Sequence, residues 1–135
     1  MDLQQFAHEV FSAQPFSQFV GAELTQVGPN SAEIRIRITD NLKQQHGFVH
    51  GGVISYLADN AITFAGGLAL GGNALTSEFK INYLKPAVGD LLVGRSSARS
   101  AGKRQAVCQC EIYVTADGQE KLCALAQGTV VPSSG

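Results

Sequence analysis

Charge is sparse in this chain of 135 residues: only 16% are Asp, Glu, Lys or Arg, whereas 44% are hydrophobic. So apolar a composition excludes an intrinsically disordered protein. The charge content is also low for a small monomer, so we expect part of the surface to be buried against another copy of the chain. The net charge is −1 and no basic run is present, which makes nucleic acids and anionic membranes poor candidate partners.

Cysteine motifs and export signals are lacking as well. The three cysteines include no C-x-x-C pair, and their odd number argues against a disulfide framework and a zinc site. Cys108 and Cys110 are expected to be small core residues of a strand. The N-terminus has neither the basic start nor the apolar run of a secretory signal, and no apolar stretch of membrane-spanning length is free of polar residues. We therefore expect one cytoplasmic domain over residues 1–135.

Hydrophobic spacing predicts the elements at the start of the chain. Successive apolar residues separated by three, four and one positions form one side of a helix, and they predict a helix over about residues 2–13. Asp2 can cap the start of this helix, and Pro15 ends it. The apolar residues that follow Pro15 predict one more short helical turn. Alternation of apolar and polar residues predicts strands over 22–27 and 32–38, which a Gly-Pro-Asn turn joins into a hairpin.

A long apolar helix is predicted from Gly51 to about Leu68. A helix that is apolar nearly all round is buried, and the only charged residue of this one is Asp59. Because a buried carboxylate loses its water, Asp59 is either held by hydrogen bonds or used in chemistry. Glycine pairs at 66–67 and 71–72 can end the helix. They lack the preceding strand and the spacing of a dinucleotide-binding fingerprint.

Four strands are predicted after the helix, over residues 74–84, 91–100, 105–115 and 121–131. Short turns join them, among them an Asp-Gly hairpin signal, so we expect an antiparallel meander. Residues 132–135 are expected to form a disordered tail. The order of elements predicts an α+β fold, in which one long buried helix is wrapped by a curved antiparallel sheet.

Motifs lie at the start of the long helix and in the strand that follows it. Gly47-x-x-His50-Gly51-Gly52 is followed by Leu57-x-Asp59-x-Ala61, and then by Thr76-x-x-x-x-Ile81-x-Tyr83-Leu84-x-Pro86-x-x-x-Asp90. Over roughly residues 44–128 the chain resembles the hotdog-fold acyl-CoA thioesterases of the phenylacetate-pathway type and of the thioesterase superfamily member 2 class. The resemblance implies hydrolysis of an acyl- or aryl-CoA thioester to the free acid and CoA. It implies no metal or other cofactor, since CoA enters as part of the substrate, and it implies homodimers that pair into tetramers.

The resemblance also implies roles for individual residues. Gly51 offers its backbone N–H to the thioester carbonyl, Asp59 is the nucleophile or general base, and His50 helps to hold the loop and the carbonyl site. Gln44 stands where the family has an asparagine, and Thr76 stands where it has a serine. Both are expected to position the reacting groups. The residues expected to contact CoA are Tyr83, Lys85, Pro86, Gly102, Lys103 and Arg104.

Thioester chemistry explains why so few groups are needed. A thiol with a pKa of about 8.5 departs readily as thiolate, so the leaving group needs little help. One carboxylate and one oxyanion site are therefore a sufficient set. Gly51, at the predicted helix N-terminus, offers a free N–H and the helix dipole to negative charge, and it has no side chain to obstruct a substrate.

Plainer explanations stay open for the same residues. Gly51 can serve helix–sheet packing, His50 and Gln44 can be ordinary loop residues, and Asp59 can be a structural buried acid. The basic turn residues can be solvated charges that contact no phosphate. His46 and His50 have the i, i+4 spacing of a metal pair, but the loop around Gly47 breaks the helix that such a pair needs.

Two other functions are alternatives. A hotdog hydratase or dehydratase would act on enoyl or 3-hydroxyacyl thioesters with His50 and a carboxylate as its acid/base pair. A non-catalytic acyl-CoA-binding protein would use the same fold without turnover. The sequence does not identify the acyl group, because that depends on which of four apolar side chains face the pocket. These are Tyr56, Phe64, Phe48 and Leu57.

The distance between Gly51 and Asp59 predicts a site shared by two chains. Eight residues separate them, which is about 12 Å along a helix. A carboxylate must come within about 3–3.5 Å of the reacting carbon, or lie one water away. Two such helices packed antiparallel about a two-fold axis would bring Asp59 of one chain to Gly51 of the other. We therefore expect a homodimer with two shared active sites.

Overall fold

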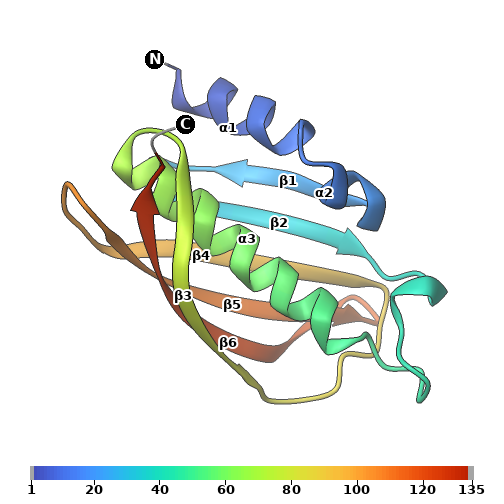
Figure 1. The fold of residues 1–135 in the computed structure, drawn as a ribbon. Helices are drawn as coiled ribbons and strands as arrows, with labels where there is room; N and C mark the ends of the chain where they lie inside the picture. Colours follow the sequence, from blue (N-terminus) through green and yellow to red (C-terminus); the bar gives the residue numbers. More distant parts are fainter. Residues whose placement is uncertain (1, 134–135) are drawn as a thin grey trace.

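Helix α3 (Gly51–Leu70) runs through the middle of the protein in the computed structural model, which describes residues 2–133 (Figure 1). His50 caps its start, since Nδ1 accepts a hydrogen bond from the Gly52 N–H over 2.9 Å. The helix ends at Gly71, whose φ of 86° lies in the left-handed region that glycine adopts without strain. It is two residues longer than predicted, because the left-handed cap is Gly71 and not the glycine pair at 66–67.

The strands form one six-stranded antiparallel sheet that curves around α3 (Figure 1). Their bounds are β1 (Ala22–Val27), β2 (Ser31–Arg37), β3 (Ala74–Tyr83), β4 (Leu91–Ala101), β5 (Ala106–Ala116) and β6 (Gln119–Pro132). Their order across the sheet is β1-β2-β4-β5-β6-β3. The predicted α+β hotdog arrangement is confirmed, and each predicted strand lies within two residues of its observed bounds.

The predicted meander of the last four strands is wrong in one respect. β4, β5 and β6 follow one another, but β3 pairs with β6, with Ala74 opposite Pro132 and Tyr83 opposite Ala124. The connection from β3 to β4, residues 84–90, is too long for a tight hairpin and starts along β6, where the Leu84 N–H donates to the Cys123 carbonyl. β3 is therefore one edge of the sheet, and β1 is the other.

Two short helices, α1 (Leu3–Ser12) and α2 (Pro15–Val20), precede β1 and correspond to the predicted N-terminal helix and extra turn. As expected, Asp2 caps α1: its Oδ1 accepts a hydrogen bond from the Gln5 N–H over 3.1 Å. The apolar side of α1 packs toward α3, where the ring centroids of Phe11 and Phe64 lie 5.6 Å apart. A short 3-10 turn, η1 (Asp40–Leu42), lies in the loop between β2 and α3.

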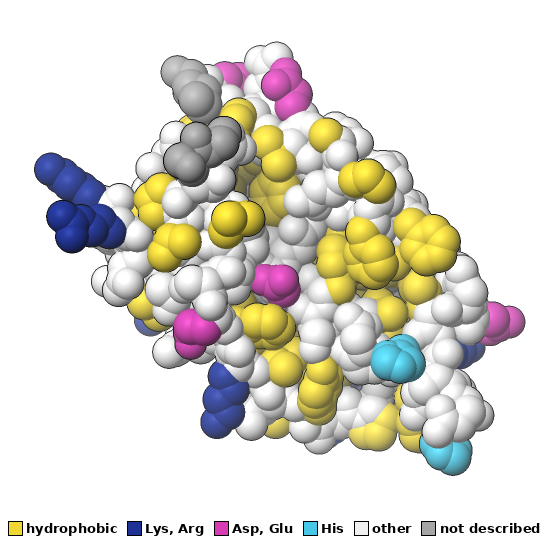
Figure 2. All heavy atoms as spheres, viewed as in Figure 1, with side chains coloured by type: hydrophobic (Ala, Val, Ile, Leu, Met, Phe, Trp, Pro, Cys, Tyr) yellow, Lys and Arg dark blue, Asp and Glu magenta, His cyan; other side chains and the backbone are white. Residues whose placement is uncertain are grey.

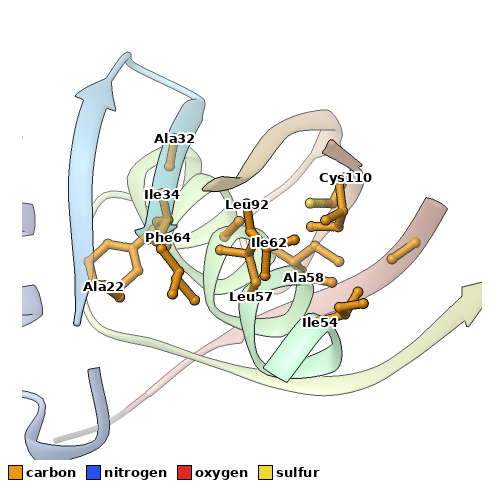
Figure 3. Packing of buried hydrophobic residues seen from close by; sticks show 14 of the residues in the cluster. Ala22, Ala32, Ile34, Ile54, Leu57, Ala58, Ile62, Phe64, Leu92 and Cys110 are labelled. Atoms are coloured by element: carbon orange, nitrogen blue, oxygen red, sulfur yellow. The ribbon is translucent and has the colours of Figure 1, made fainter. Parts of the chain in front are cut away.

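The hydrophobic core lies between α3 and the inner face of the sheet (Figure 3). Side chains from α3, β2, β4 and β5 point toward one another there: Ile54, Leu57, Ala58 and Ile62 meet Ile34, Leu92 and Cys110. The free thiols of Cys108 and Cys110 are buried, so their prediction as core residues is confirmed. Burial raises the pKa of Cys110 to about 12. α3 has the length and apolar composition of a membrane span, but most of it is buried in the protein, and it is the core helix.

The end of the chain is better ordered than predicted. Pro132 is the last residue of β6, and the Ser133 N–H donates to the Asn73 carbonyl over 2.8 Å. The prediction of a disordered tail from residue 132 is wrong for these two residues, because backbone pairing with the start of β3 holds them. Residues 134–135 lie outside the described part of the chain.

Candidate active site

One side of α3 carries four residues at intervals of one helical turn: Gly51, Ser55, Asp59 and Thr63. Residues four apart are neighbours on a helix surface, so these four lie along the same side. β3 runs beside them, because Tyr83 contacts Ser55 and Thr76 contacts Thr63. These six residues are called the α3–β3 strip below. The strip unites the predicted site residues Gly51, Asp59 and Thr76.

The first turn of α3 presents a free backbone donor. His50 Nδ1 takes the Gly52 N–H, whereas the Gly51 N–H has no hydrogen-bond partner within residues 2–133. The Tyr83 hydroxyl donates to the Gly51 carbonyl oxygen over 3.2 Å and lies 2.5 Å from Ser55 Oγ. The Gly51 N–H is thus available, at the positive end of the helix dipole, to a carbonyl or anionic oxygen.

Asp59 lies two turns further along α3 and is half-buried. Its Oδ1 is fully buried and has no hydrogen-bond partner among the described residues. A buried carboxylate oxygen without a donor is costly. The structural explanation, in which hydrogen bonds hold a buried acid in place, therefore does not account for this atom. A half-buried carboxylate whose charge is not offset by a donor at Oδ1 suits a nucleophile or a general base.

The Thr76 hydroxyl on β3 contacts α3 through the hydroxyl of Thr63. Thr63 Oγ1 lies 2.5 Å from Thr76 Oγ1 and donates to the Asp59 carbonyl oxygen over 2.8 Å. Because the Thr63 proton is used on that carbonyl, Thr76 is the donor in the pair. Thr63 and Ser55 were not among the site residues predicted from the sequence. Their positions one turn after and one turn before Asp59 were the signal that could have found them.

Gln44 lies in the turn that precedes α3. Its side-chain oxygen accepts a hydrogen bond from the His46 N–H. Its backbone N–H donates to the Phe48 carbonyl over 2.8 Å and closes the turn. Among the described residues, no hydrogen bond joins the Gln44 side chain to His50, Asp59 or Thr76.

The histidine pair near the helix start is not arranged for a metal. His50 Nδ1 is engaged with the Gly52 N–H. A nitrogen that accepts a hydrogen bond carries no proton, so neutral His50 holds its proton on Nε2. Within residues 2–133 there is no group of three or more His, Cys, Asp and Glu side chains that could hold a metal ion.

The residues expected to contact CoA fall into two exposed groups at opposite ends of the sheet (Figure 1). Residues 85–86 follow the end of β3. Residues 102–104 form the β4–β5 turn next to Ala106. Val130 pairs with both Ala106 and Thr76, which places this turn toward the beginning of β3. One chain therefore does not bring Lys85 and Pro86 together with Gly102, Lys103 and Arg104. The remaining member, Tyr83, contacts the first turn of α3.

Tyr56, one of the side chains considered for the acyl pocket, is held toward α2. Its hydroxyl lies 2.5 Å from Ser17 Oγ and accepts a hydrogen bond from the Asn60 amide over 3.1 Å. Burial raises the pKa of Tyr56. Leu57 is fully buried in the core, and Phe64 is buried against α1. Tyr56 thus docks α2 on α3, on the side of the helix away from β3.

Exposed hydrophobic side chains border α3 on both sides. They are Phe16 and Phe19 on α2, Leu75 and Tyr83 on β3, and Leu84 and Val88 in the loop that follows β3. Figure 2 shows hydrophobic side chains gathered over this face of the molecule. Clustered apolar surface of this kind marks interaction sites in soluble proteins. This face is the candidate for burial against another copy.

Comparison with known proteins gives a family and several relatives. The family model described as the Thioesterase superfamily matches residues 46–121. The acyl-coenzyme A thioesterase PaaI of Escherichia coli K12 is 29% identical over 128 residues, which cover 92% of this chain and 86% of that protein. The 1,4-dihydroxy-2-naphthoyl-CoA hydrolase of Listeria monocytogenes is 26% identical over 113 residues, which cover 82% and 89%. The crystal structure of a thioesterase family protein from Silicibacter pomeroyi gives a TM-score of 0.91 at 30% identity, over 96% of each chain.

Proposed function

Since the chain belongs to the thioesterase superfamily and is a thioester hydrolase of the hotdog fold, we propose that its substrate is an acyl- or aryl-CoA thioester, which it hydrolyses to the free acid and CoA. Relatives named as an acyl-CoA thioesterase and a CoA hydrolase support this substrate class. The observation that carries the proposal is a pair of free groups on α3. These are the Gly51 N–H, which has no partner in the described chain, and the half-buried carboxylate of Asp59, whose Oδ1 has no donor there.

The Gly51 N–H is the proposed oxyanion donor. It points from the helix N-terminus, where the dipole favours the negative charge that develops on the thioester oxygen. His50 supports this role because it takes the neighbouring Gly52 N–H and caps the turn. Tyr83 supports it from the other side through the Gly51 carbonyl. Gln44 acts further back, where it braces the turn before α3 through the His46 N–H.

Asp59 is the proposed base or nucleophile. As a base it takes a proton from water, the water oxygen bonds to the carbonyl carbon, and the C–S bond breaks to release CoA thiolate. As a nucleophile its carboxylate oxygen bonds to the carbonyl carbon, the C–S bond breaks to release CoA thiolate, and water then hydrolyses the resulting mixed anhydride. Thr63 and Thr76 hold the backbone around Asp59 in either route. The thiolate leaves without a metal or other cofactor, and CoA enters with the substrate.

We propose that each site is shared between two chains. Along α3, Gly51 and Asp59 of one chain are about 12 Å apart, too far for both to act on one carbonyl. β3 is a ten-residue edge strand with a free side, bordered by exposed hydrophobic residues. If two β3 edges pair antiparallel about a two-fold axis, the Tyr83 end of one strand meets the Thr76 end of the other. That pairing brings the first turn of one α3 toward Asp59 of its partner.

The same pairing supports the proposed contacts with CoA. The basic residue Lys85 of one chain then lies at the same end of the double sheet as Lys103 and Arg104 of the other. Charges that one chain holds at opposite ends of its sheet are thereby available to one CoA molecule. Lys and Arg side chains form strong charge-assisted hydrogen bonds with phosphate.

Asp59→Asn tests the catalytic assignment. The substitution keeps the shape of the side chain but removes the base or nucleophile, so kcat should fall by at least about 100-fold, as for loss of an acid/base group. The measurement is thiol release from a panel of acyl-CoAs. Asp117→Asn is the matched control, because Asp117 is exposed in the β5–β6 turn and its φ of 53° suits asparagine. Near wild-type hydrolysis by Asp59→Asn would show that the assignment is wrong.

The same assays separate the alternative functions. A hydratase needs His50 as an acid/base group, but one of its two ring nitrogens already serves as the helix cap. Hydration of an enoyl-CoA, followed by absorbance, without thiol release would favour the hydratase. Binding of acyl-CoA without turnover would favour a non-catalytic binding protein.

We further propose a cytoplasmic enzyme whose dimers pair into tetramers. The free thiols of Cys108, Cys110 and Cys123 support a reducing compartment. The low charge content and the exposed hydrophobic side chains support burial of surface between copies. Light scattering at several protein concentrations gives the number of chains.

A further inference from the structure

A small apolar cavity of about 80 Å³ lies between α1 and the C-terminal half of α3. Phe6 and Val10 of α1 form one wall, and Phe64 and Gly67 of α3 form another. Ala74, the first residue of β3, also lines the cavity beside Gly67. Three polar side chains also border the cavity, but most of its lining is apolar, and apolar space of this kind readily accepts hydrocarbon. This cavity is therefore a candidate site for an apolar part of a ligand.

The cavity borders the α3–β3 strip at Thr63. This residue lines the cavity, and its hydroxyl also contacts Thr76 and the Asp59 carbonyl. Thr63 lies one turn beyond Asp59, and Gly67 lies one turn beyond Thr63, on the same side of α3. A chain that starts at the reacting carbonyl and follows this side of the helix therefore passes Thr63 and enters the cavity.

The opposite direction along α3 is not available to such a chain. In the proposed shared site, the first turn of the partner's α3 occupies the side of Asp59 that faces Ser55. Toward α2, the space is taken by the hydrogen-bonded cluster of Tyr56, Ser17 and Asn60. The side toward Gly67 and α1 is the remaining direction.

We propose that this cavity receives the far end of an unbranched aliphatic acyl chain, a substrate class that rests on the proposed thioesterase activity. Thr63 lies about 6 Å beyond Asp59 along the helix axis, and Gly67 lies about 12 Å beyond it. An extended chain advances roughly 1.2 Å per single bond. The cavity therefore begins about five bonds from the carbonyl and ends about ten bonds from it. Acyl groups of about six to ten carbons reach it, whereas acetyl and butyryl groups do not.

The size of the cavity favours a straight chain over a ring. An engineered apolar cavity of about 150 Å³ holds one benzene molecule, and this cavity has about half that volume. Most of its lining is apolar and none of the lining residues is charged, so an ammonium group at the far end of the chain would lose water without gaining an ionic partner.

The test uses S-alkyl-CoA thioethers, which lack the carbonyl and cannot be hydrolysed, beside the corresponding acyl-CoAs. Calorimetric Kd values for butyl to dodecyl thioethers should fall by about fourfold per added methylene once the chain reaches the cavity. The increase in affinity with each added methylene should stop at about ten carbons. The kcat/KM values of the acyl-CoAs should follow the same profile.

Three variants locate the effect. Ala74→Leu fills the end of the cavity, so binding of the octyl thioether should weaken at least about tenfold, while that of the butyl thioether changes less than about threefold. Phe6→Ala removes part of the α1 wall, and the optimum should move to longer chains. His8→Ala is the matched control, because His8 is exposed on α1, the helix that carries Phe6, and does not line the cavity. Its chain-length profile should equal that of the wild type.

The outcomes distinguish the two proposals. A flat chain-length profile, or one that Ala74→Leu and Phe6→Ala leave unchanged, overturns the acyl-chain assignment even if hydrolysis is rapid. A length-dependent thioether affinity that responds to both variants supports the cavity, even if no acyl-CoA is hydrolysed. In that case the thioesterase proposal is the one that fails.

Discussion

At the scale of single residues, the candidate site depends on which polar atoms of α3 are already occupied. His50 Nδ1 accepts a hydrogen bond from the Gly52 N–H, and the Tyr83 hydroxyl donates one to the Gly51 carbonyl oxygen. The Gly51 N–H and Asp59 Oδ1 have no partner within residues 2–133. Asp59 Oδ1 is costly to leave unpaired because it is buried, and functional groups are often retained in this way. The Gly51 N–H is free because it belongs to the first turn of the helix.

The contact between Tyr83 and Ser55 can be measured with a double-mutant cycle. Tyr83→Phe removes the hydroxyl that contacts Ser55 Oγ and the Gly51 carbonyl, so the free energy of unfolding should fall by about 1 kcal/mol. Ser55→Ala removes the other partner. Because the two variants delete one shared bond, their effects in urea denaturation should not add.

The control for this cycle pairs Tyr83→Phe with Ser100→Ala, since Ser100 is exposed on β4 and has no contact with Tyr83. Those two effects should add within about 0.5 kcal/mol. Full additivity for Tyr83 and Ser55 would mean that the hydroxyl pair does not form in solution.

At the scale of elements, the outer face of the sheet is joined by a charge network. The Glu33 side chain on β2 is only 5% exposed, and its carboxylate meets Arg35 Nε at 2.7 Å and Arg95 Nε at 3.0 Å. Arg95 on β4 also makes a two-bond contact with Glu120 on β6, at 2.8 and 2.7 Å. The network ties β2, β4 and β6 together on the face away from α3.

This network predicts a loss of stability in acid. Burial raises the pKa of Glu33, but hydrogen bonds from Arg35, Thr25 and Arg95 outweigh it and hold that pKa below its usual value. A folded pKa below the unfolded value of about 4.3 gives stability that is complete above that pH and is lost as the pH falls through the folded pKa. The urea midpoint should therefore drop between pH 6 and pH 3.

Glu33→Gln isolates this contribution. The variant should be less stable than the wild type at pH 7, by about 1–3 kcal/mol, because Arg35 and Arg95 lose a charged partner. Its urea midpoint should also fall less steeply toward pH 3. If wild type and variant lose stability in parallel between pH 6 and pH 3, the proposed contribution of Glu33 is absent.

At the scale of the whole molecule, one chain supplies only part of the proposed site. Gly51 and Asp59 lie two turns apart on a straight helix, and the basic turns lie at opposite ends of the sheet. The free edge of β3 lies beside the α3–β3 strip. If two chains pair antiparallel through this edge, Gly51 of each chain comes close to Asp59 of the other. The two-fold axis makes this happen twice, so the dimer has two complete sites.

Complementation tests the shared site. Asp59→Asn and Gly51→Val chains should each be inactive alone. In the second, a Cβ at position 51 already lies 3.5 Å from the Tyr83 ring, so the valine methyl groups should displace the first turn of α3 and its N–H. In a mixed dimer one site carries both lesions and the other carries neither. After joint unfolding and refolding, half of the dimers are mixed and half of their sites work, so thiol release should recover to about one quarter of the wild-type rate.

Each variant refolded alone is the control, together with the two parents mixed without unfolding. Mixed dimers are verified by a tag on one chain. If verified mixed dimers stay as inactive as their parents, the shared-site geometry is refuted.

Features that depend on neighbours along the chain could be predicted from the sequence. The alternating residues of β2 and the capping Asp2 of α1 are local patterns, and the structure confirms them. The start of α3 follows from His50 and the glycines after it, and Asp59 was conspicuous as its only charge. Apolar periodicity and turn chemistry determine such elements because their energies arise within a few residues.

Features that depend on residues far apart in the chain were decided only by the tertiary structure. The pairing of β3 with β6 joins Ala74 to Pro132, and the contact of Tyr83 with Ser55 spans 28 residues. The sequence placed Tyr83 with the CoA contacts and Gln44 with the reacting groups. The structure places Tyr83 on the first turn of α3 and the Gln44 side chain on the His46 N–H. Strand partners and side-chain neighbours are selected by packing across the whole fold. The pattern of residues close together in the sequence does not specify that packing.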